Sequence, residues 1–364
     1  MDAAAASTHD PLRSGAYDPA MDCARRACLV VPFRNEARHL PDVLQSLREQ
    51  NIESVRVRYI FVDSASVDGG ARIVEEWLRA TGADGEVLRL DRPGIAVALN
   101  AAIGRAQADE ILVRLDAHTR YDPSYVRSLV DALDQLPSSV WWVGGSQSEP
   151  DAPGFGGALV RALMTNPLGL GGSDMRRTAG GLRRIDGNPY LGAFRPGTLQ
   201  SVGGFDERWT ANEDSELAAR IERAGGEIWH APAPCTYLIT RGPWETAVLW
   251  HKYGTWRART IRRHPGTLRA RHVAPPAAVV LGVALACSPA RVLLLPLAAV
   301  FAALVLARRR RGEALAVTAA SVAYFPLVHA AFGTGLLRGW CSPVRTAGAP
   351  TPLPGLDAEA APAP

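Results

Sequence analysis

The sequence of 364 residues lacks paired cysteines: it has five, and none of their spacings matches a zinc finger or a redox dithiol. An odd, scattered set of cysteines is typical of a chain that folds in a reducing compartment. A secretory signal peptide is also not visible, because the first twenty residues contain no apolar run and are interrupted by Asp2, Asp10 and Asp18. We therefore expect the globular part to be cytosolic.

A strong excess of charge of either sign is lacking as well. The chain has 40 Lys and Arg residues against 36 Asp and Glu residues, a net charge of +4. This balance gives no reason to expect a nucleic-acid partner. A length of 364 residues with 47% hydrophobic residues suits one large domain with an appendage, or two domains. The two ends, residues 1–22 and 341–364, are rich in small residues and proline, and we expect them to be disordered.

Between residues 27 and 136, short apolar segments alternate with segments of helical periodicity. Strands are expected at 27–31, 55–62, 86–90 and 111–115, and helices at 39–50, 71–81, 94–105 and 124–136. Alternating β and α segments of this length predict right-handed βαβ units. The expected fold class is therefore α/β, with a mainly parallel, Rossmann-like sheet and flanking helices.

Polar loops that contain a carboxylate follow three of these strands, at residues 32–36, 63–68 and 116–118. In open parallel sheets, ligands bind beyond the carboxyl ends of the strands. One such loop alone would be explained by ordinary loop polarity, but three at one edge favour a binding site. Asp116 and His118 could hold a metal ion there, since Mn²⁺ accepts both oxygen and imidazole ligands.

A second pair of carboxylates, Glu213 and Asp214, lies in the segment ANEDSELAARI. We expect a helix to begin near Glu213, with Asn212 or Thr210 as its cap. The helix dipole favours anions in this first turn and tends to lower their pKa, so the pair could be ordinary helix-start chemistry. A carboxylate beside a metal-bound diphosphate could also deprotonate an incoming hydroxyl. The two sites together suggest transfer of a group from a diphosphate-activated donor to an alcohol.

The composition changes abruptly at Val273, where the first of three apolar stretches begins. They span residues 273–288, 292–307 and 314–337. The first two are short for a bilayer core that needs roughly 20 residues, but Arg291 between them can extend to the membrane surface and allow a tight hairpin. A buried core helix is the alternative. The arginines between 257 and 271 and those at 308–311 are expected to face the cytoplasm.

These boundaries predict a globular domain at residues 23–265 and membrane-associated helices at 266–340. A cut after about Arg271 is expected to leave a soluble domain. The sequence does not predict how the third apolar stretch is oriented relative to the membrane. The membrane expected from this arrangement is the inner (plasma) membrane, with the catalytic domain on its cytoplasmic side.

Several motifs between residues 27 and 265 resemble the family 2 glycosyltransferases with the A-type fold. VVPFRNE resembles the family's opening strand and PxxNE turn, FVDSASVDGG its nucleoside loop, and RLDAH stands in place of its metal-binding DxD motif. GGFDERWTANEDSELAARI is similar to the family's GGFDE…ED…L pattern and is the most specific of these signals. HKYGTWRAR and the apolar C-terminal region are similar to a membrane-bound subgroup, the ExoA-like proteins of succinoglycan biosynthesis.

The resemblance implies roles for individual residues. Asp214 would be the catalytic base, with Glu213 beside it. Asp116 would face the ribose and the metal, and His118 would take the place of the motif's second aspartate. The remaining donor-binding residues implied by the resemblance are Pro32, Glu36, Asp63 and Asn100.

The chain departs from the family pattern at two places. Ser64 and Ala65 replace the usual Asp-Gly, so that the nucleoside contact would rest on Asp63 alone. Leu99 stands where many members have arginine. Arg92 or the Arg176–Arg177 pair could supply the missing charge.

The resemblance implies a membrane-associated, inverting glycosyltransferase that requires Mn²⁺ or Mg²⁺. It would move a hexose from a UDP-sugar to a lipid-linked or growing saccharide in surface or extracellular polysaccharide synthesis. Two alternatives stay open: transfer to polyprenyl phosphate itself, and a catalytically inactive nucleotide-sugar-binding scaffold. The chain reads LWHKYGTW where processive synthases have QxxRW, which argues against the synthesis of a long polymer.

Overall fold

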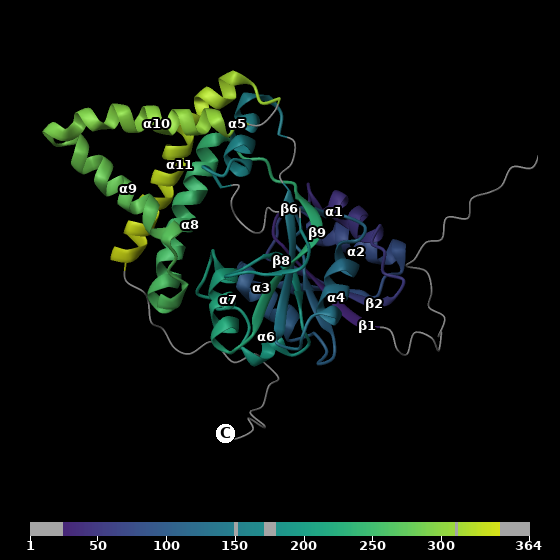
Figure 1. The fold of residues 1–364 in the computed structure, drawn as a ribbon. Coiled ribbons are helices and arrows are strands. Elements are labelled where there is room, and N and C mark those ends of the chain that lie inside the picture. Colours follow the sequence, from purple (N-terminus) through teal and green to yellow (C-terminus); the bar gives the residue numbers. More distant parts are fainter. Residues whose placement is uncertain (1–24, 149–151, 171–179, 310–311, 343–364) are drawn as a thin grey trace, which may run out of the picture.

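The computed structural model describes residues 25–148, 152–170, 180–309 and 312–342 (Figure 1). The predicted tail 1–22, the tail 341–364 from residue 343 onward, and the arginines at 176, 177, 310 and 311 lie outside these ranges. The first half follows the predicted alternation, and every predicted boundary is within two residues. Its elements are β1 (Arg25–Phe33), α1 (Leu40–Arg48), β2 (Val55–Ser64), α2 (Gly70–Thr81), β3 (Gly85–Leu90), α3 (Ile95–Ile103), β4 (Ile111–Arg114), β5 (Thr119–Tyr121) and α4 (Tyr125–Gln135).

The second half adds strands and helices in a less regular order. They are β6 (Val140–Ser148), α5 (Gly154–Thr165), β7 (Arg183–Arg184), β8 (Tyr190–Phe194), α6 (Thr198–Ser201), α7 (Glu213–Arg223), β9 (Glu227–Tyr237) and α8 (Pro243–Arg263). After the short turn η3 (Pro265–Thr267) come α9 (Ala270–Ala286), η4 (Pro289–Leu293), α10 (Leu294–Ala307) and α11 (Leu315–Cys341).

The nine described strands form a single mixed sheet with the order β3-β2-β1-β4-β8-β6-β9-β5, and β7 pairs with β9. The strands β3, β2, β1 and β4 are parallel, as predicted. Beyond β4 the sheet is mixed, because β8 runs antiparallel to both β4 and β6. A glycine allows this close pairing: Gly192 has φ +122°, and a Cβ there would lie 2.2 Å from the carbonyl oxygen of Val143.

The sheet is covered by helices on both faces, which explains the uninterrupted apolar run in β1. Leu29 and Val31 pack with α1, α2 and α4, whereas Cys28 and Val30 pack with α3 and α7. Adjacent residues of a strand point to opposite faces, so a strand covered on both sides reads as continuously apolar. Full burial of each large apolar side chain contributes roughly 1.5–3 kcal/mol.

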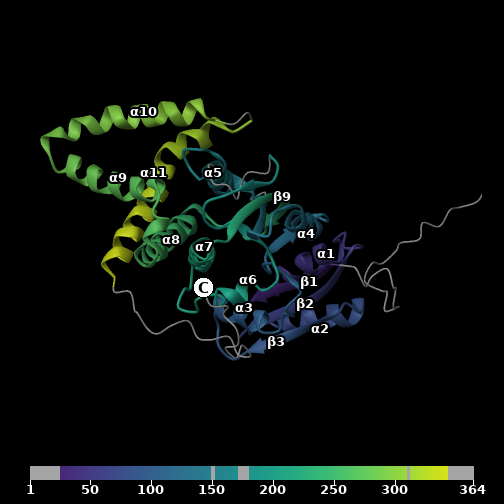
Figure 2. The ribbon, with the colours of Figure 1, turned by 60° about the horizontal axis from the view of Figure 1, so that its bottom comes forward.

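The C-terminal helices form a second layer beside α8. Figures 1 and 2 show α9 and α10 extending away from the sheet and meeting at a tip. Two segments are long and apolar enough to cross a membrane: Pro289–Ala307, whose most apolar window is 6% buried, and Leu315–Cys341, with 33% buried. The helix Ala270–Ala286 is apolar but shorter. The large apolar side chains exposed along α9, η4 and α10 include Val280, Leu281, Val283, Val292, Leu293, Leu295, Leu297 and Val300.

Three glycines let α8 and α11 pack backbone against backbone. A Cβ at Gly254 would lie 2.1 Å from the Phe332 carbonyl oxygen, and one at Gly335 would lie 2.0 Å from that of His251. Gly339 is equally close to Thr255, at 2.2 Å. Small residues that allow such close approach are typical of packed apolar helices. A cut after Arg271 would remove α11 from the face of α8 against which it packs, so we expect the shortened chain to be less stable than the whole.

Candidate active site

A cavity of about 1700 Å³ opens at the carboxyl ends of β1, β2 and β4 and continues to α8, α9 and α11. Pockets for a single small ligand are typically about 300–1,000 Å³, so this cavity has room for two substrates. Six of the predicted site residues line it: Pro32, Glu36, Asp116, His118, Glu213 and Asp214. The structure thus brings together predicted residues from the ends of β1 and β4 and from the start of α7.

Arg114, the last residue of β4, lies between three carboxylates. Its Nη1 contacts Asp214, while Nη2 is 3.3 Å from Glu213 Oε1 and 3.6 Å from Asp116 Oδ1. The guanidinium also lies over the Phe205 ring, 5.6 Å from its centroid. The sequence analysis missed this residue. The available signal was a charged residue inside the otherwise apolar strand ILVRL, where burial requires a partner of opposite charge.

The helix α7 begins at Glu213 with Asn212 at the N-cap position, as predicted, but the side chain of Asn212 makes no capping hydrogen bond. Asn212 adopts a left-handed conformation with φ 57°, and its Nδ2 donates instead to the carbonyl oxygen of Tyr253 in α8, at 3.0 Å. The residue before the carboxylate pair is therefore tied to α8 by its side chain and to α7 by its backbone oxygen.

Asp214 has an environment that disfavours its charge. Burial raises the pKa of Asp214 to about 7; the charges of Glu213 and Asp116 act in the same direction, and Arg114 opposes them. The expectation that the helix start would lower this pKa is therefore wrong, because burial among like charges outweighs the dipole. A carboxylate that titrates near neutral pH is well suited to act as a general base.

Asp116 and His118 are placed so that both could bind one metal ion. The Nε2 of His118 is 3.9 Å from Asp116 Oδ2, and a ligand lies about 2 Å from such a metal. The other ring nitrogen, Nδ1, is 2.9 Å from Glu36 Oε1, and such a contact orients a ligating histidine. The second oxygen of Glu36 is 2.8 Å from His39 Nδ1.

The donor set of oxygen and imidazole fits Mn²⁺. Among the described residues, no group of three or more His, Cys, Asp or Glu side chains is placed to hold a metal ion. A cation held by Asp116 and His118 would keep coordination positions for other ligands. Such an open site suits a cation that is bound together with a diphosphate.

Asp63 and Asn100 lie outside the cavity lining and shape the loops around it. Asp63 Oδ1 accepts a hydrogen bond from the backbone N–H of Ser66 at 2.8 Å. Buried Asn100 forms two hydrogen bonds with the backbone of Phe205, at 2.9 and 2.8 Å, and so joins α3 to the segment before α7. Arg92, which lines the cavity, pairs with Glu207 at 2.7 Å.

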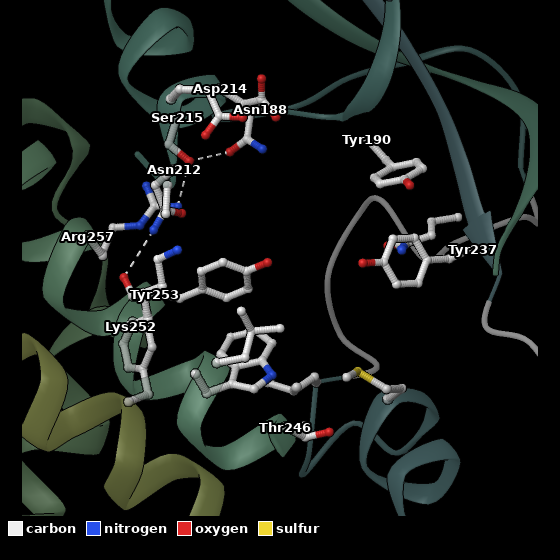
Figure 3. A pocket seen from close by; sticks show the side chains of 18 of the residues that line it. Asn188, Tyr190, Asn212, Asp214, Ser215, Tyr237, Thr246, Lys252, Tyr253 and Arg257 are labelled. Atoms are coloured by element: carbon white, nitrogen blue, oxygen red, sulfur yellow. Dashed lines mark hydrogen bonds between the residues drawn. The ribbon is translucent and has the colours of Figure 1, made fainter. Parts of the chain in front are cut away.

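Figure 3 shows the wall of this cavity in close view. Asn188, Asp214 and Ser215 lie together at one end, with Arg257 beside Ser215, while Tyr190 and Tyr237 lie across the opening. Ser215 Oγ donates to Asn188 Oδ1 at 2.6 Å and accepts from Arg257 Nη2 at 2.8 Å.

Comparison with known proteins agrees with this geometry. Residues 28–155 match the family described as glycosyl transferase family 2. The chain is 30% identical over 259 residues to the succinoglycan biosynthesis protein ExoA of Rhizobium meliloti, covering 68% of this chain and 73% of that protein.

A solved mannosyltransferase structure shares the fold. The mannosyltransferase PcManGT from Pyrobaculum calidifontis, in complex with GDP-Man and Mn²⁺, has a TM-score of 0.54 and 20% identity, over 86% of this chain and 88% of its own. S. aureus TarS 1–349 in complex with UDP-GlcNAc has a TM-score of 0.48 and 14% identity, over 84% and 90%. The family match and the similarity to ExoA show that the chain belongs to glycosyl transferase family 2. It is an ExoA-like glycosyltransferase with the A-type fold.

Proposed function

We propose that this enzyme transfers a hexose from a UDP-sugar, with inversion, to a lipid-linked saccharide during exopolysaccharide synthesis. One observation carries the proposal: a single cavity contains the Asp116–His118 pair and Asp214, and then continues to the apolar C-terminal helices. A soluble acceptor would not need this continuation. The relative ExoA acts in succinoglycan biosynthesis, which supports the class of product.

The donor site is assigned to the strand ends. Asp116 and His118 would hold Mn²⁺ or Mg²⁺, which neutralises the charge that develops on a departing diphosphate. Glu36 holds the His118 ring through Nδ1, so that Nε2 faces Asp116. Pro32, which lines the cavity, would face the nucleoside of the donor. Asp63 and Asn100 contribute by holding the neighbouring loops in place.

Asp214 is assigned as the general base. Its carboxylate would take the proton from the acceptor hydroxyl as the new glycosidic bond forms, and a direct displacement inverts the sugar carbon. A pKa near 7 leaves a large fraction ionised at neutral pH and makes the carboxylate a stronger base than an exposed aspartate. Glu213 is held by Arg114 and adds to the negative charge around the base.

The apolar helices are assigned to the membrane. The α9–α10 hairpin exposes its large apolar side chains, which is costly in water and favourable in lipid. We place α10 and α11 in the inner membrane. The arginines that precede α9 and follow α10 then lie at its cytoplasmic surface.

The test is a donor screen with the full chain purified in detergent, in Mn²⁺, with release of the nucleoside diphosphate as readout. We expect release from one UDP-sugar to be stimulated by a lipid-linked saccharide and not by polyprenyl phosphate. Stimulation by polyprenyl phosphate alone would identify the enzyme as a polyprenyl-phosphate glycosyltransferase. UDP binding without any turnover would support an inactive scaffold and refute the proposal.

A further inference from the structure

The cavity extends beyond the carboxylates, and its far part carries positive charge. Lys252 and Arg257 come from α8, and Arg269 and Arg271 come from the start of α9. In Figure 3, Lys252 and Arg257 lie on the same wall as Ser215 and Asn212. We call the four side chains the cationic cluster. All four line this cavity, and the turn between α8 and α9 brings Arg271 close enough to act on Arg257. Lys252 is the only lysine of the chain.

The cationic cluster has no carboxylate partner among the described residues. Arg257 Nη2 donates to the Ser215 hydroxyl, and Arg269 Nη1 donates to the backbone oxygen of Gly266 at 2.7 Å. In the described structure no hydrogen bond or ion pair involves the side chain of Lys252 or Arg271. Arg257 is partly buried, whereas Lys252 and Arg271 are exposed. Several other partly buried arginines pair with carboxylates, as Arg58 does with Glu110 at 2.9 Å.

Like charges in the cationic cluster act on one another. Burial and the charge of Arg271 lower the pKa of Arg257 to about 10. Burial lowers the pKa of His272, and the charges of Arg257, Arg269 and Arg271 lower it further. Cations that are held close together repel one another, and a bound anion with more than one charge stabilises them by offsetting this repulsion.

The lining beyond the cationic cluster is apolar. It contains side chains of α9, α10 and α11: Ala274, Pro275, Ala278, Val279, Phe301, Val328 and Phe332. A free phosphate or nucleotide would leave this lining in water. A multiply charged anion that carries an apolar chain would cover both parts, and the cavity volume of about 1700 Å³ leaves room for it beside a sugar donor.

We propose that the cationic cluster binds the diphosphate of an isoprenoid-linked acceptor, whose apolar chain lies along α9 and α11. The attached saccharide then points toward Asp214, because Arg257 bonds to Ser215, the next residue in α7. This inference rests on the proposed function, of which it names the residues that hold the acceptor. Arg257 and Arg271 are binding residues for the lipid diphosphate and take no part in proton transfer.

The probe is geranyl diphosphate, a short water-soluble isoprenyl diphosphate, added to the full chain in detergent with EDTA present. Without metal, binding at the donor site is suppressed, while arginines still bind an anion. Arg257→Gln and Arg271→Gln should each weaken binding about tenfold or more, as expected for a lost charge-assisted hydrogen bond. Arg223→Gln, which removes an exposed charge outside the cavity lining, should bind as wild type does. Equal affinity in all four proteins would overturn the inference.

A second pair of variants tests the apolar chain. Ala278→Trp fills the lining on α9, whereas Val280→Trp lies on the same helix outside it. Ala278→Trp should weaken the binding of geranyl diphosphate and leave the binding of inorganic diphosphate unchanged. Val280→Trp should leave the binding of both probes unchanged. If inorganic diphosphate binds as tightly as geranyl diphosphate to every variant, the cluster is a site for free phosphates and the lipid assignment is wrong.

The inference and the proposed function fail in different ways. UDP binding with Mn²⁺ is measured on the same proteins, and the cationic-cluster variants should keep the wild-type affinity. A wild-type chain that transfers sugar but does not bind geranyl diphosphate would refute the cationic-cluster site alone. A wild-type chain that binds geranyl diphosphate but not UDP would support the cationic-cluster site and refute the proposed donor.

Discussion

Replacing Arg114 by methionine should move the acidic limb of the pH–rate profile to higher pH. The guanidinium contacts Asp214 and lies 3.3 and 3.6 Å from the nearest oxygens of Glu213 and Asp116. A charge pair about 4 Å apart interacts by about 4 kcal/mol at an effective dielectric constant of about 20. Since one pKa unit corresponds to about 1.36 kcal/mol, removal of the cation raises the pKa of Asp214 by at most about 3 units.

The direction of this pH shift follows from the proposed role of Asp214 as the general base. A general base acts when deprotonated, so activity is lost as the pH falls through its pKa, which is about 7 in the wild type. In Arg114→Met we expect this loss at a pH roughly 1–3 units higher. The assay is kcat/KM for UDP release across pH, at saturating Mn²⁺. Arg114→Lys keeps the charge and should stay close to the wild-type profile.

One result would refute this reasoning. If Arg114→Met lowers the rate by the same factor at every pH, then Arg114 supports the fold and does not set the pKa of the base. UDP binding by each variant, measured by calorimetry, shows whether the donor site has survived the substitution.

Further substitutions test the other parts of the site and the fold. Asp214→Asn should slow transfer by about 10²-fold or more while UDP affinity is kept, whereas Glu213→Gln should be milder; the reverse order would assign the base to Glu213. His118→Ala should raise the Mn²⁺ concentration needed for half-maximal activity without lowering Tm, and an unchanged Mn²⁺ requirement would make His118 a structural residue. Gly335→Ala should cost about 1–3 kcal/mol of stability, seen as a lower Tm in detergent, because its Cβ would lie 2.0 Å from a backbone oxygen. Gly282→Ala, whose Cβ would meet nothing within 4 Å, is the matched control, and equal Tm values in the two would contradict the close packing of α8 and α11.

The first half of the fold could be predicted from the sequence because its elements follow simple periods. Each strand from β1 to β4 is an apolar run followed by a helix with one buried face, and the parallel edge of the sheet follows from that order. Two carboxylates of the site were found for the same reason, since Glu36 and Asp116 follow the ends of β1 and β4. The strands β7 and β8 escaped prediction, because glycines interrupt any period and pairing with distant strands decides their conformation.

Arg114 could not be assigned from its neighbours in sequence. Its partner Asp214 lies 100 positions away, so that their contact depends on how α7 packs against the end of β4. The same holds for Asn212, whose side chain donates to a carbonyl oxygen of α8 and does not cap its own helix. Local propensity predicts that a cap or an ion pair is needed, but tertiary packing decides which partner supplies it.

The cationic cluster illustrates a further limit. The sequence shows arginines on both sides of residue 265, and they were interpreted as a signal of membrane orientation. Some of them, Arg257, Arg269 and Arg271, line the cavity, where we propose that they bind the acceptor. The spacing in the sequence does not distinguish these two uses.

With α11 in the bilayer as proposed, its backbone contact with α8 would hold the active site at a fixed height above the membrane. Gly254, Gly335 and Gly339 let the two helices pack backbone against backbone, and α8 in turn holds Asn212, next to the Glu213–Asp214 pair. With α11 in the bilayer as proposed, Asp214 stays at one distance from the lipid surface. An acceptor would then react only when its terminal hydroxyl lies at the same distance from the lipid surface as Asp214. The added hexose would place the new terminal hydroxyl farther from the surface than Asp214. The enzyme would thus measure the length of the saccharide as well as its identity, and it would add one sugar and stop.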